Sequence, residues 1–407
     1  MTTSRSDTGG VVDGYLELGL ALGRHVDGMV DAYYGPAELA SRVNREPKRS
    51  AERLVAEARE LIAAIEGGAP LDAGVNDDPA RRRWLRAQVV GLLTTARRLA
   101  GEHISYPDEV ELCYGVRPHP LEWDEVAEAH KRLESVVPGS GQLEERLNVW
   151  REAHAVPRAK LFDAIHVLAE DLRERTQKLF GLPDGESCDF ELVNDKPWGG
   201  FNTYLGGLHS RVDINTDLPV LSLSLPGLVA HEAYPGHHTE HTRKEVGLVR
   251  SRKWLEETIF LVGTPQCLLA EGLADLGLRV VMGGRHEREV SEHFAPLGIR
   301  YDADVAGEIA EAALVLSRVR ATAAWRLHAE GADREVVVDE LSRWALLPRA
   351  RAEKAVEFLL HPTWRAYITC YVEGYELCRQ FVGDDPRRFG RLISEQLVPD
   401  DLKAAAS

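Results

Sequence analysis

Apolar residues recur at helical spacing along most of this 407-residue chain, and this periodicity constrains the fold more than any other feature. In the first half the pattern covers Val11–Ala32, Ala51–Ile65, Ala80–Leu99, Trp123–Val137, Leu143–Ala153 and Ala159–Phe180. In the second half it covers Trp254–Met282, Asp304–Glu330, Asp333–Leu346, Arg349–Leu360 and Trp364–Phe381. Because prolines and glycines separate these segments, we expect a mainly α-helical protein of many helices.

The helical pattern stops in the middle of the chain. Leu182–Gly207 is rich in Gly, Pro, Asn and aromatic residues, and Ser210–Asn215 alternates polar and apolar residues as a strand does. We therefore expect one short β element here, followed by a helix. We also expect a helical N-terminal lobe at 1–180, a second lobe at 181–400 that forms one compact unit with the first, and a flexible tail at 401–407.

The composition limits the partners and the location. The 49 basic and 65 acidic residues give a net charge of −16, which repels phosphate backbones, so we expect no nucleic-acid partner. No apolar run reaches the roughly 18 residues of a membrane span. The N-terminal MTTSRSDTGG has no apolar signal core. We therefore expect a cytoplasmic protein with no membrane contact, in which the five scattered cysteines are reduced thiols.

The residues best suited to metal binding and catalysis lie in Leu228–His241, LVAHEAYPGHHTEH. Imidazole is a common metal ligand, and an apolar-led helix has little structural use for several histidines, so the segment predicts a metal site. Its histidines and glutamates are His231, Glu232, His237, His238, Glu240 and His241. The His-Glu start is like the HExxH pattern, in which two histidines one turn apart bind zinc and the glutamate acts as general base.

The spacing departs from HExxH because Pro235 occupies the position of the second histidine. In a straight helix His237 would lie about 120° around the axis from His231, and His238 would lie about 10.5 Å along it. Two ligands of one zinc ion lie within about 4 Å of each other. Proline and glycine both interrupt regular helices, so we expect a break at Pro235–Gly236 that returns His237 or His238 to His231.

The stretch His231–His238, HEAYPGHH, resembles the HExxPGHH signature of a bacterial family of unknown function, which is similar in fold to the thermostable carboxypeptidase (Taq-type) zinc peptidases. The resemblance extends to Ser210–Pro219 and Ala270–Gly277. It implies a helical zinc-peptidase-like fold with a deep cleft and one zinc ion. The Gly-His ending of related motifs favours His237 as the second ligand. His238 is then the alternative ligand, or a residue behind the ligands or facing substrate.

A third ligand is expected from a second helix downstream, as in zinc peptidases with a glutamate ligand. Glu271 follows in a helix flanked by leucines, where a carboxylate needs a partner. Asp275 lies one turn later on the same face and could accept a hydrogen bond from a ligand histidine, which would fix its tautomer. The predicted ligands are thus His231, His237 and Glu271. They suit Zn, and Mn, Co or Fe would fit them as well.

Further side chains are candidates for catalysis and substrate binding. Glu232 is the predicted general base. Tyr367 and Tyr371 lie one helical turn apart and could stabilise an oxyanion, although tyrosines at helical spacing more often belong to a core or a cleft wall. We expect Ser210–Asn215 to be an edge strand that pairs with the substrate backbone, or else an ordinary packing strand. The candidate substrate-binding residues are Arg211, Asn202 and Tyr204.

These observations favour a zinc-dependent hydrolase that cleaves the amide bonds of short peptides, in the manner of a peptidase or carboxypeptidase. One alternative is a metal-dependent hydrolase or lyase of a small amide metabolite. The two substrate classes can be distinguished by an arginine near the metal. If Arg211, Arg349 or Arg365 points toward the metal, it could bind the carboxylate of a peptide, which would favour the peptidase. The other alternative is a non-catalytic metal-binding scaffold, which would have no need of Glu232.

Overall fold

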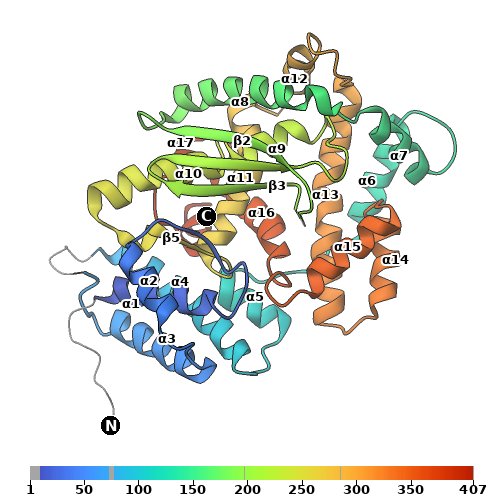
Figure 1. Cartoon of the computed structure of the whole chain (residues 1–407). Helices are drawn as coiled ribbons and strands as arrows, with labels where there is room; N and C mark the ends of the chain where they lie inside the picture. Colours follow the sequence, from blue (N-terminus) through green and yellow to red (C-terminus); the bar gives the residue numbers. More distant parts are fainter. Residues whose placement is uncertain (1–9, 73–77, 197, 285, 407) are drawn as a thin grey trace.

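The computed structural model describes residues 10–72, 78–196, 198–284 and 286–406, and most of them are helical, as the periodicity predicts (Figure 1). The helices before residue 181 are α1 (Val11–Gly23), α2 (Ala37–Arg45), α3 (Ala51–Glu66), α4 (Pro79–Leu99), α5 (Tyr106–Tyr114), α6 (Trp123–Val136), α7 (Leu143–Ala153) and α8 (Arg158–Phe180). Several begin at a residue that caps them. The Ser50 and Ser105 hydroxyls accept hydrogen bonds from the Arg53 and Asp108 backbone N–H groups.

The second half of the chain contains the remaining α-helices and three short helices of other types. The α-helices are α9 (Leu225–Glu232), α10 (His237–Lys244), α11 (Pro265–Met282), α12 (Glu287–Phe294), α13 (Ala303–His328), α14 (Arg334–Trp344), α15 (Arg349–Leu360), α16 (Tyr375–Val382), α17 (Pro386–Leu392) and α18 (Pro399–Ala406). The others are the π-helices η1 (Glu245–Arg250) and η3 (Cys370–Gly374) and the 3-10 helix η2 (Leu255–Thr258). None of the described helices is long and apolar enough to cross a membrane.

The β structure is more extensive than the single element expected. A three-stranded sheet has the order β2-β4-β3, from β2 (Ser187–Val193), β4 (His209–Asn215) and β3 (Gly200–Gly206). The strand β4 pairs in parallel with β2 and antiparallel with β3. A second sheet pairs β1 (Val30–Tyr33) with β5 (Ile259–Leu261), which joins segments more than 200 residues apart. Because β4 is the central strand, the expectation that Ser210–Asn215 forms a free edge is wrong, and β3 is an edge strand instead.

Several expected elements differ from those observed. The expected helix Trp364–Phe381 is helical only from Ile368 and includes the π-helix η3 before α16. Val11–Ala32 does not form one helix, because α1 ends at Gly23 and the chain turns into β1. The segment Trp254–Met282 is divided into η2, β5 and α11, because Pro265 lacks a backbone donor and starts a helix more readily than it continues one. The expected flexible tail is in fact helix α18 as far as Ala406, with Leu402 buried, whereas Ser407 lies outside the described residues.

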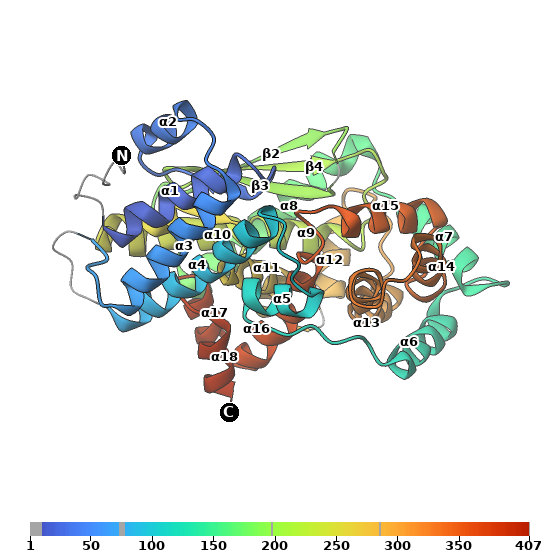
Figure 2. The same ribbon diagram turned by 90° about the horizontal axis from the view of Figure 1, so that it is seen from below.

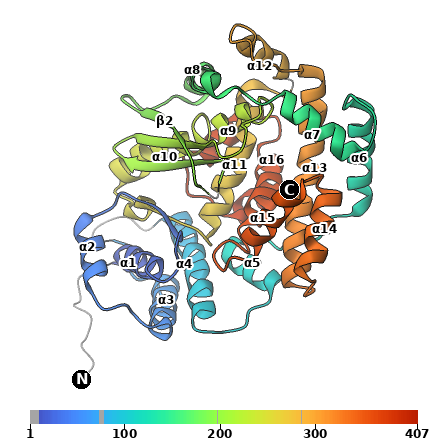
Figure 3. The same ribbon diagram turned by 45° about the vertical axis from the view of Figure 1, so that its right-hand side comes forward.

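The helix α11 lies where the parts of the molecule meet, and it contacts α9, α16, η3 and α8. The described residues form three apolar cores. The first packs α11 against α5, α6 and α13–α16. The second joins α1, α3 and α4 to β5, and the third lies between the three-stranded sheet, α8, α9 and α12. Figure 2 shows that sheet on the side of the molecule opposite α17 and α18. Figure 3 shows α13, α14 and α15 grouped together, and these three helices contact one another. The division into lobes at residue 180 remains a prediction.

Candidate metal centre

The His-rich segment contains the predicted break in its helix. The helix α9 ends at Glu232, α10 begins at His237, and Pro235 and Gly236 lie between them. The Gly236 amide donates a hydrogen bond to the Ala230 carbonyl at 2.9 Å. A Cβ atom on residue 236 would lie 1.9 Å from the His231 carbonyl oxygen, so only glycine fits at this position. The close turn brings the first residue of α10 back beside the end of α9.

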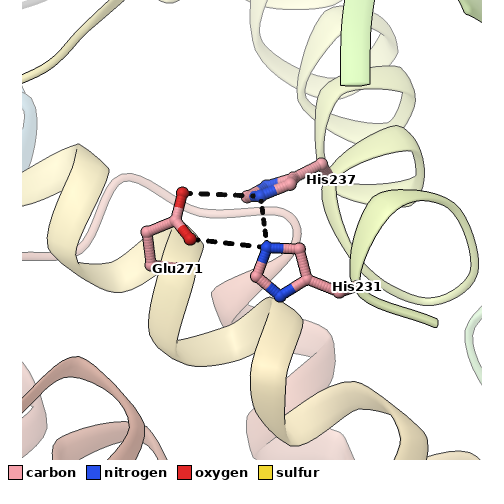
Figure 4. Close-up of side chains that lie close together, drawn as sticks. All are labelled: His231, His237 and Glu271. Carbon is pink, nitrogen blue, oxygen red and sulfur yellow. Dashed lines mark hydrogen bonds and ion pairs between the residues drawn. The ribbon is translucent and has the colours of Figure 1, made fainter. Parts of the chain in front are cut away.

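Three side chains converge across this break, as Figure 4 shows. The His231 Nε2 atom lies 3.1 Å from His237 Nε2. The Glu271 Oε2 atom, from α11, lies 3.4 Å from His231 Nε2, and Glu271 Oε1 lies 3.5 Å from His237 Nε2. Within the described part of the chain, these residues form the only group of three or more His, Cys, Asp or Glu side chains that could hold a metal ion. They are the three ligands predicted from the sequence.

The spacing of these atoms fits a metal ion at their centre. Two zinc bonds of about 2.0–2.1 Å at a tetrahedral angle place the ligand atoms roughly 3.4 Å apart, close to the three separations. In addition, the nearest donor to the buried Glu271 Oε2 atom among the described residues is His231 Nε2 at 3.4 Å, which forms no well-directed hydrogen bond with it. A cation would therefore satisfy a carboxylate oxygen that is otherwise unpaired. Imidazole and carboxylate donors suit zinc, and Mn, Co and Fe accept the same donors.

The groups behind the three ligands set their charge and orientation. Asp275 Oδ1 lies 2.8 Å from His231 Nδ1, which keeps a proton on that nitrogen and leaves Nε2 for a metal. The Tyr367 hydroxyl donates a 2.7 Å hydrogen bond to Glu271 Oε1. Burial raises the pKa of Glu271, but His231, His237 and Tyr367 outweigh it and lower the pKa to about 2. Glu271 is therefore a carboxylate anion at neutral pH.

The other candidate ligand, His238, lies outside this group and is fully buried. Its Nδ1 atom lies 2.8 Å from the Ser210 hydroxyl, and its Nε2 atom lies 2.7 Å from Glu186 Oε2. Glu186 also accepts a hydrogen bond from the Tyr234 hydroxyl and forms an ion pair with Arg173. Both ring nitrogens are thus occupied, and His238 joins α10 to the sheet instead of facing a metal or a substrate.

The predicted base, Glu232, lies at the end of α9 with only 6% of its surface exposed. The Asn202 side-chain amide, from β3, donates to the Glu232 carbonyl at 2.7 Å. A Cβ atom on Gly200 would lie 3.0 Å from Glu232 Oε1, so the glycine leaves room for this carboxylate. Burial raises the pKa of Glu232 to about 7, with Glu271 and Asp275 adding to the rise and His231 opposing it. Glu232 is therefore a proton acceptor with an affinity suited to neutral pH.

The predicted tyrosines lie on the side of the centre formed by η3 and the segment before it. The Tyr371 ring is stacked with its centroid 6.4 Å from that of His231, and it contacts the Tyr367 ring. The Tyr367 hydroxyl is already hydrogen-bonded to the Glu271 carboxylate. Tyr371 therefore lies beside His231 without a hydrogen bond to the Glu271 carboxylate.

Three expected substrate-binding residues lie elsewhere or have another role. Asn202 is buried and supports the Glu232 backbone, although its Oδ1 atom has no partner among the described residues. Tyr204 is buried and its hydroxyl donates to Glu245. Arg211 pairs with Asp213. It lies on the face of β4 opposite Ser210 and therefore opposite the face that contacts α10.

The arginines proposed as carboxylate anchors are also occupied. Arg349 pairs with Glu335, Asp339 and Glu353 at the surface. Arg365 pairs with the buried Glu109. Neither guanidinium is free to hold a substrate.

The structure brings together another group of arginines, which the sequence did not predict. Arg320 on α13 and Arg351 on α15 are solvent-exposed, and within the described residues no carboxylate pairs with either. Among the described residues, Arg151 donates to the Asn148 side chain and the Leu346 carbonyl and pairs with no carboxylate. Burial, with the charges of Arg351 and Arg320, lowers the pKa of Arg151 to about 10. Helical periodicity gives no sign of this group, because its members come from three separate helices.

Asp31 is a second residue that the sequence did not single out. It lies in β1 between Val30 and Ala32, where the register with β5 shifts, as in a β-bulge. Burial, followed by the charges of Glu271 and Glu232, raises the pKa of Asp31 to about 7. The N-terminal strand thus adds a carboxylate near the metal centre.

The chain is similar in structure to three solved proteins at low sequence identity. Two are "putative lipoproteins". The one from Colwellia psychrerythraea has a TM-score of 0.57 at 17% identity, covering 88% of this chain and 66% of that protein. The one from Shewanella oneidensis, of unknown function, has a TM-score of 0.49 at 12% identity, covering 97% and 82%. The third is an M32 carboxypeptidase from Deinococcus radiodurans R1, with a TM-score of 0.39 at 12% identity, covering 97% and 92%.

No protein-family model and no curated protein matches the chain. This chain spans 66% of the length of the Colwellia protein, and the likeness to it establishes a shared fold. Fold and site together define a mainly helical protein with a His-His-Glu group that could hold a metal ion.

Proposed function

We propose that the protein is a zinc-dependent hydrolase that cleaves amide bonds of short peptides. The observation that carries the proposal is the convergence of His231, His237 and Glu271 across the helix break, with the Glu232 carboxylate beside them. A site that only stores metal needs the three ligands but not a fourth carboxylate with a pKa near neutrality. Glu232 therefore favours the enzyme over the non-catalytic scaffold.

Each residue has a distinct role in this proposal. Bound zinc would supply Lewis acidity, lowering the pKa of water and polarising a carbonyl. Glu232 takes the proton of the attacking water and passes it to the leaving amine. Asp275 holds the His231 ring through its Nδ1 proton. Tyr371, on η3, lies beside His231 and would donate a hydrogen bond to the oxygen that gains charge during attack.

We further propose that Arg320 and Arg351 bind the C-terminal carboxylate of the peptide, which makes the enzyme a carboxypeptidase. Three guanidinium groups that act on one another without a paired carboxylate attract an anion. Tyr371 is close enough to Arg320 to interact with it electrostatically, so this group lies on the Tyr371 side of the metal centre. A free carboxylate held there would direct the last peptide bond toward Glu232, and a small neutral amide would gain nothing from it.

Membership of the HExxPGHH family is part of this proposal, and the segment that supports it is His231–His238 with its break at Pro235–Gly236. We also propose, on the sequence arguments given above, that the protein is cytoplasmic and has a deep cleft beside the metal. On the same arguments we propose that it has no nucleic-acid or membrane partner. Fractionation of the native cells tests the location. Recovery with the membrane fraction would reject the cytoplasmic assignment.

The first test is elemental analysis of the wild type and of His231→Ala, purified in parallel without chelator. We expect about one zinc ion per wild-type chain and a loss of that ion in the variant. Wild-type protein that holds no stoichiometric metal after incubation with zinc or cobalt would overturn the proposal. If metal is present, digestion of a peptide library followed by mass spectrometry then reports cleavage and its direction, with Glu232→Gln as the control.

A further inference from the structure

The second metal ligand, His237, has an unpaired nitrogen. The Nε2 atom of His237 faces His231 and Glu271, which leaves Nδ1 to carry a proton when Nε2 binds a metal. Nδ1 is buried and has no hydrogen-bond partner among the described residues. By contrast, Nδ1 of His231 is held by Asp275 at 2.8 Å. A buried N–H donor without an acceptor is unfavourable, so His237 needs a group that fulfils this role.

Glu240 has the matching unpaired acceptor. Its Oε1 atom accepts a 2.7 Å hydrogen bond from Lys244 Nζ, whereas Oε2 is buried with no partner in the described structure. Glu240 follows His237 by three residues on α10, and residues three apart are neighbours on one face of a helix. Only 2% of the surface of Glu240 is exposed, so water does not readily compensate Oε2.

The charges around His237 leave Glu240 as the available partner. The groups whose charges act on this imidazole are Glu271, His231 and Glu240. Glu271 and His231 are themselves ligands and face Nε2. Glu240 is therefore the one of these three groups that is not a candidate ligand.

We propose that Glu240 is the positioning residue of His237: its Oε2 atom accepts a hydrogen bond from the Nδ1–H group when Nε2 binds the metal. Each metal-binding histidine would then have its own carboxylate, Asp275 for His231 and Glu240 for His237. The two carboxylates differ in burial: Asp275 is exposed, whereas Glu240 is buried. This inference rests on the proposed metal site, and it assigns a role to a residue of the His-rich segment that the reaction does not use directly.

The experiment measures zinc affinity by competition with a chromophoric chelator, together with the visible absorption spectrum of the cobalt-loaded protein. We expect Glu240→Gln to weaken zinc binding roughly ten- to a hundredfold, as loss of a carboxylate behind a ligand histidine does, and to change the cobalt spectrum. Lys244→Met is the matched control, because it breaks the same buried ion pair but keeps the carboxylate. Its affinity is expected to stay within about threefold of the wild type.

The outcomes separate this inference from the proposed function. Wild-type affinity in Glu240→Gln, or an equal loss in Lys244→Met, would overturn the positioning role while leaving the metal site in place. A wild-type protein that binds no zinc would reject both. If Glu240→Gln does not fold because it leaves Lys244 buried and unpaired, the double variant Glu240→Gln/Lys244→Met replaces it, and the same loss of affinity is expected.

Discussion

Two buried carboxylates near the metal centre have opposite protonation behaviour. The pKa of Glu271 is about 2, because hydrogen bonds and charges from two histidines and a tyrosine outweigh its burial. The pKa of Glu232 is about 7, because burial dominates and its neighbours include two further carboxylates. Anionic Glu271 is suited to bind a cation, and Glu232 is suited to exchange a proton. The surroundings thus give the same side-chain type two different proton affinities.

Glu232→Gln tests the assignment of the base at the residue scale. The amide keeps the size of the side chain but cannot accept a proton, so we expect kcat to fall by about 10²–10⁴. Zinc content should remain at the wild-type level because the three ligands are untouched. Peptidase assays and elemental analysis on the same preparations measure both quantities. Retention of more than a tenth of the wild-type kcat would show that another group acts as base.

At the scale of elements, the break between α9 and α10 assembles the site. A regular helix would keep the two histidine rings apart, and the turn at Gly236 removes that separation. A second close approach places Glu271 opposite the break. A Cβ atom on Gly272 would lie 2.2 Å from the Gly374 carbonyl oxygen, so α11 and η3 pack with their backbones nearly in contact. The geometry of the candidate metal site therefore depends on Gly236 and Gly272, which have no side chain to bind a metal or react.

Gly236→Ala should disrupt the break, because the new methyl group would overlap the His231 carbonyl at 1.9 Å. We expect loss of stoichiometric zinc and a lower thermal midpoint for the variant. Gly247→Ala is the matched control, since no atom lies within 4 Å of the added Cβ, and it should bind zinc as the wild type does. Elemental analysis and thermal unfolding measure the two effects. Normal zinc content in Gly236→Ala would contradict the role of the break.

The junction of α8, α10 and the sheet depends on ionised Glu186. Burial raises its pKa, but His238, Tyr234 and Arg173 outweigh this and lower the pKa from 4.5 to about 2. A lowered carboxyl pKa stabilises the fold above the unfolded pKa and loses that contribution as the pH falls toward the folded pKa. The upper limit of this contribution is ~3 kcal/mol at neutral pH.

Glu186→Gln should therefore be less stable than the wild type at pH 7, and the difference should shrink between pH 4.5 and 2. Urea unfolding at a series of pH values measures the difference in unfolding free energy. A Glu170→Gln variant, at an exposed position on α8, controls for the loss of one negative charge. A difference that does not change with pH would show that the ion pair with Arg173 and the hydrogen bonds are not responsible.

At the scale of the whole molecule, the metal centre and the arginine group come from distant parts of the chain. The candidate ligands are on α9, α10 and α11, whereas the arginines are on α7, α13 and α15. The packing of α13 against η3, which contacts α11, places Arg320 on the Tyr371 side of the centre. The N-terminal strand β1 adds Asp31 through its pairing with β5. The site therefore includes side chains from both halves of the sequence.

Arg320→Ala tests the carboxylate anchor at this scale. We expect KM for peptides with a free C-terminus to rise roughly tenfold or more, because a charged hydrogen bond is lost, whereas C-terminally amidated peptides should respond little. Arg318→Ala, on the same helix but paired with Glu125, is the matched control and should leave both KM values unchanged. Steady-state kinetics on the two peptide series measures the effect. An equal change for free and amidated peptides would reject the anchor.

The sequence by itself determined the helical class, the break at Pro235–Gly236, the candidate ligands His231 and Glu271 with either His237 or His238, and the contact of Asp275 with His231. These follow from local rules: apolar spacing, the backbone limits of proline and glycine, and the short distance between ligands of one ion. Only the tertiary structure decided the pairing of β1 with β5, the central place of β4, the burial of His238 with Glu186, and the gathering of Arg320, Arg351 and Arg151. These features join residues far apart in the chain, and neither periodicity nor spacing contains information about such contacts.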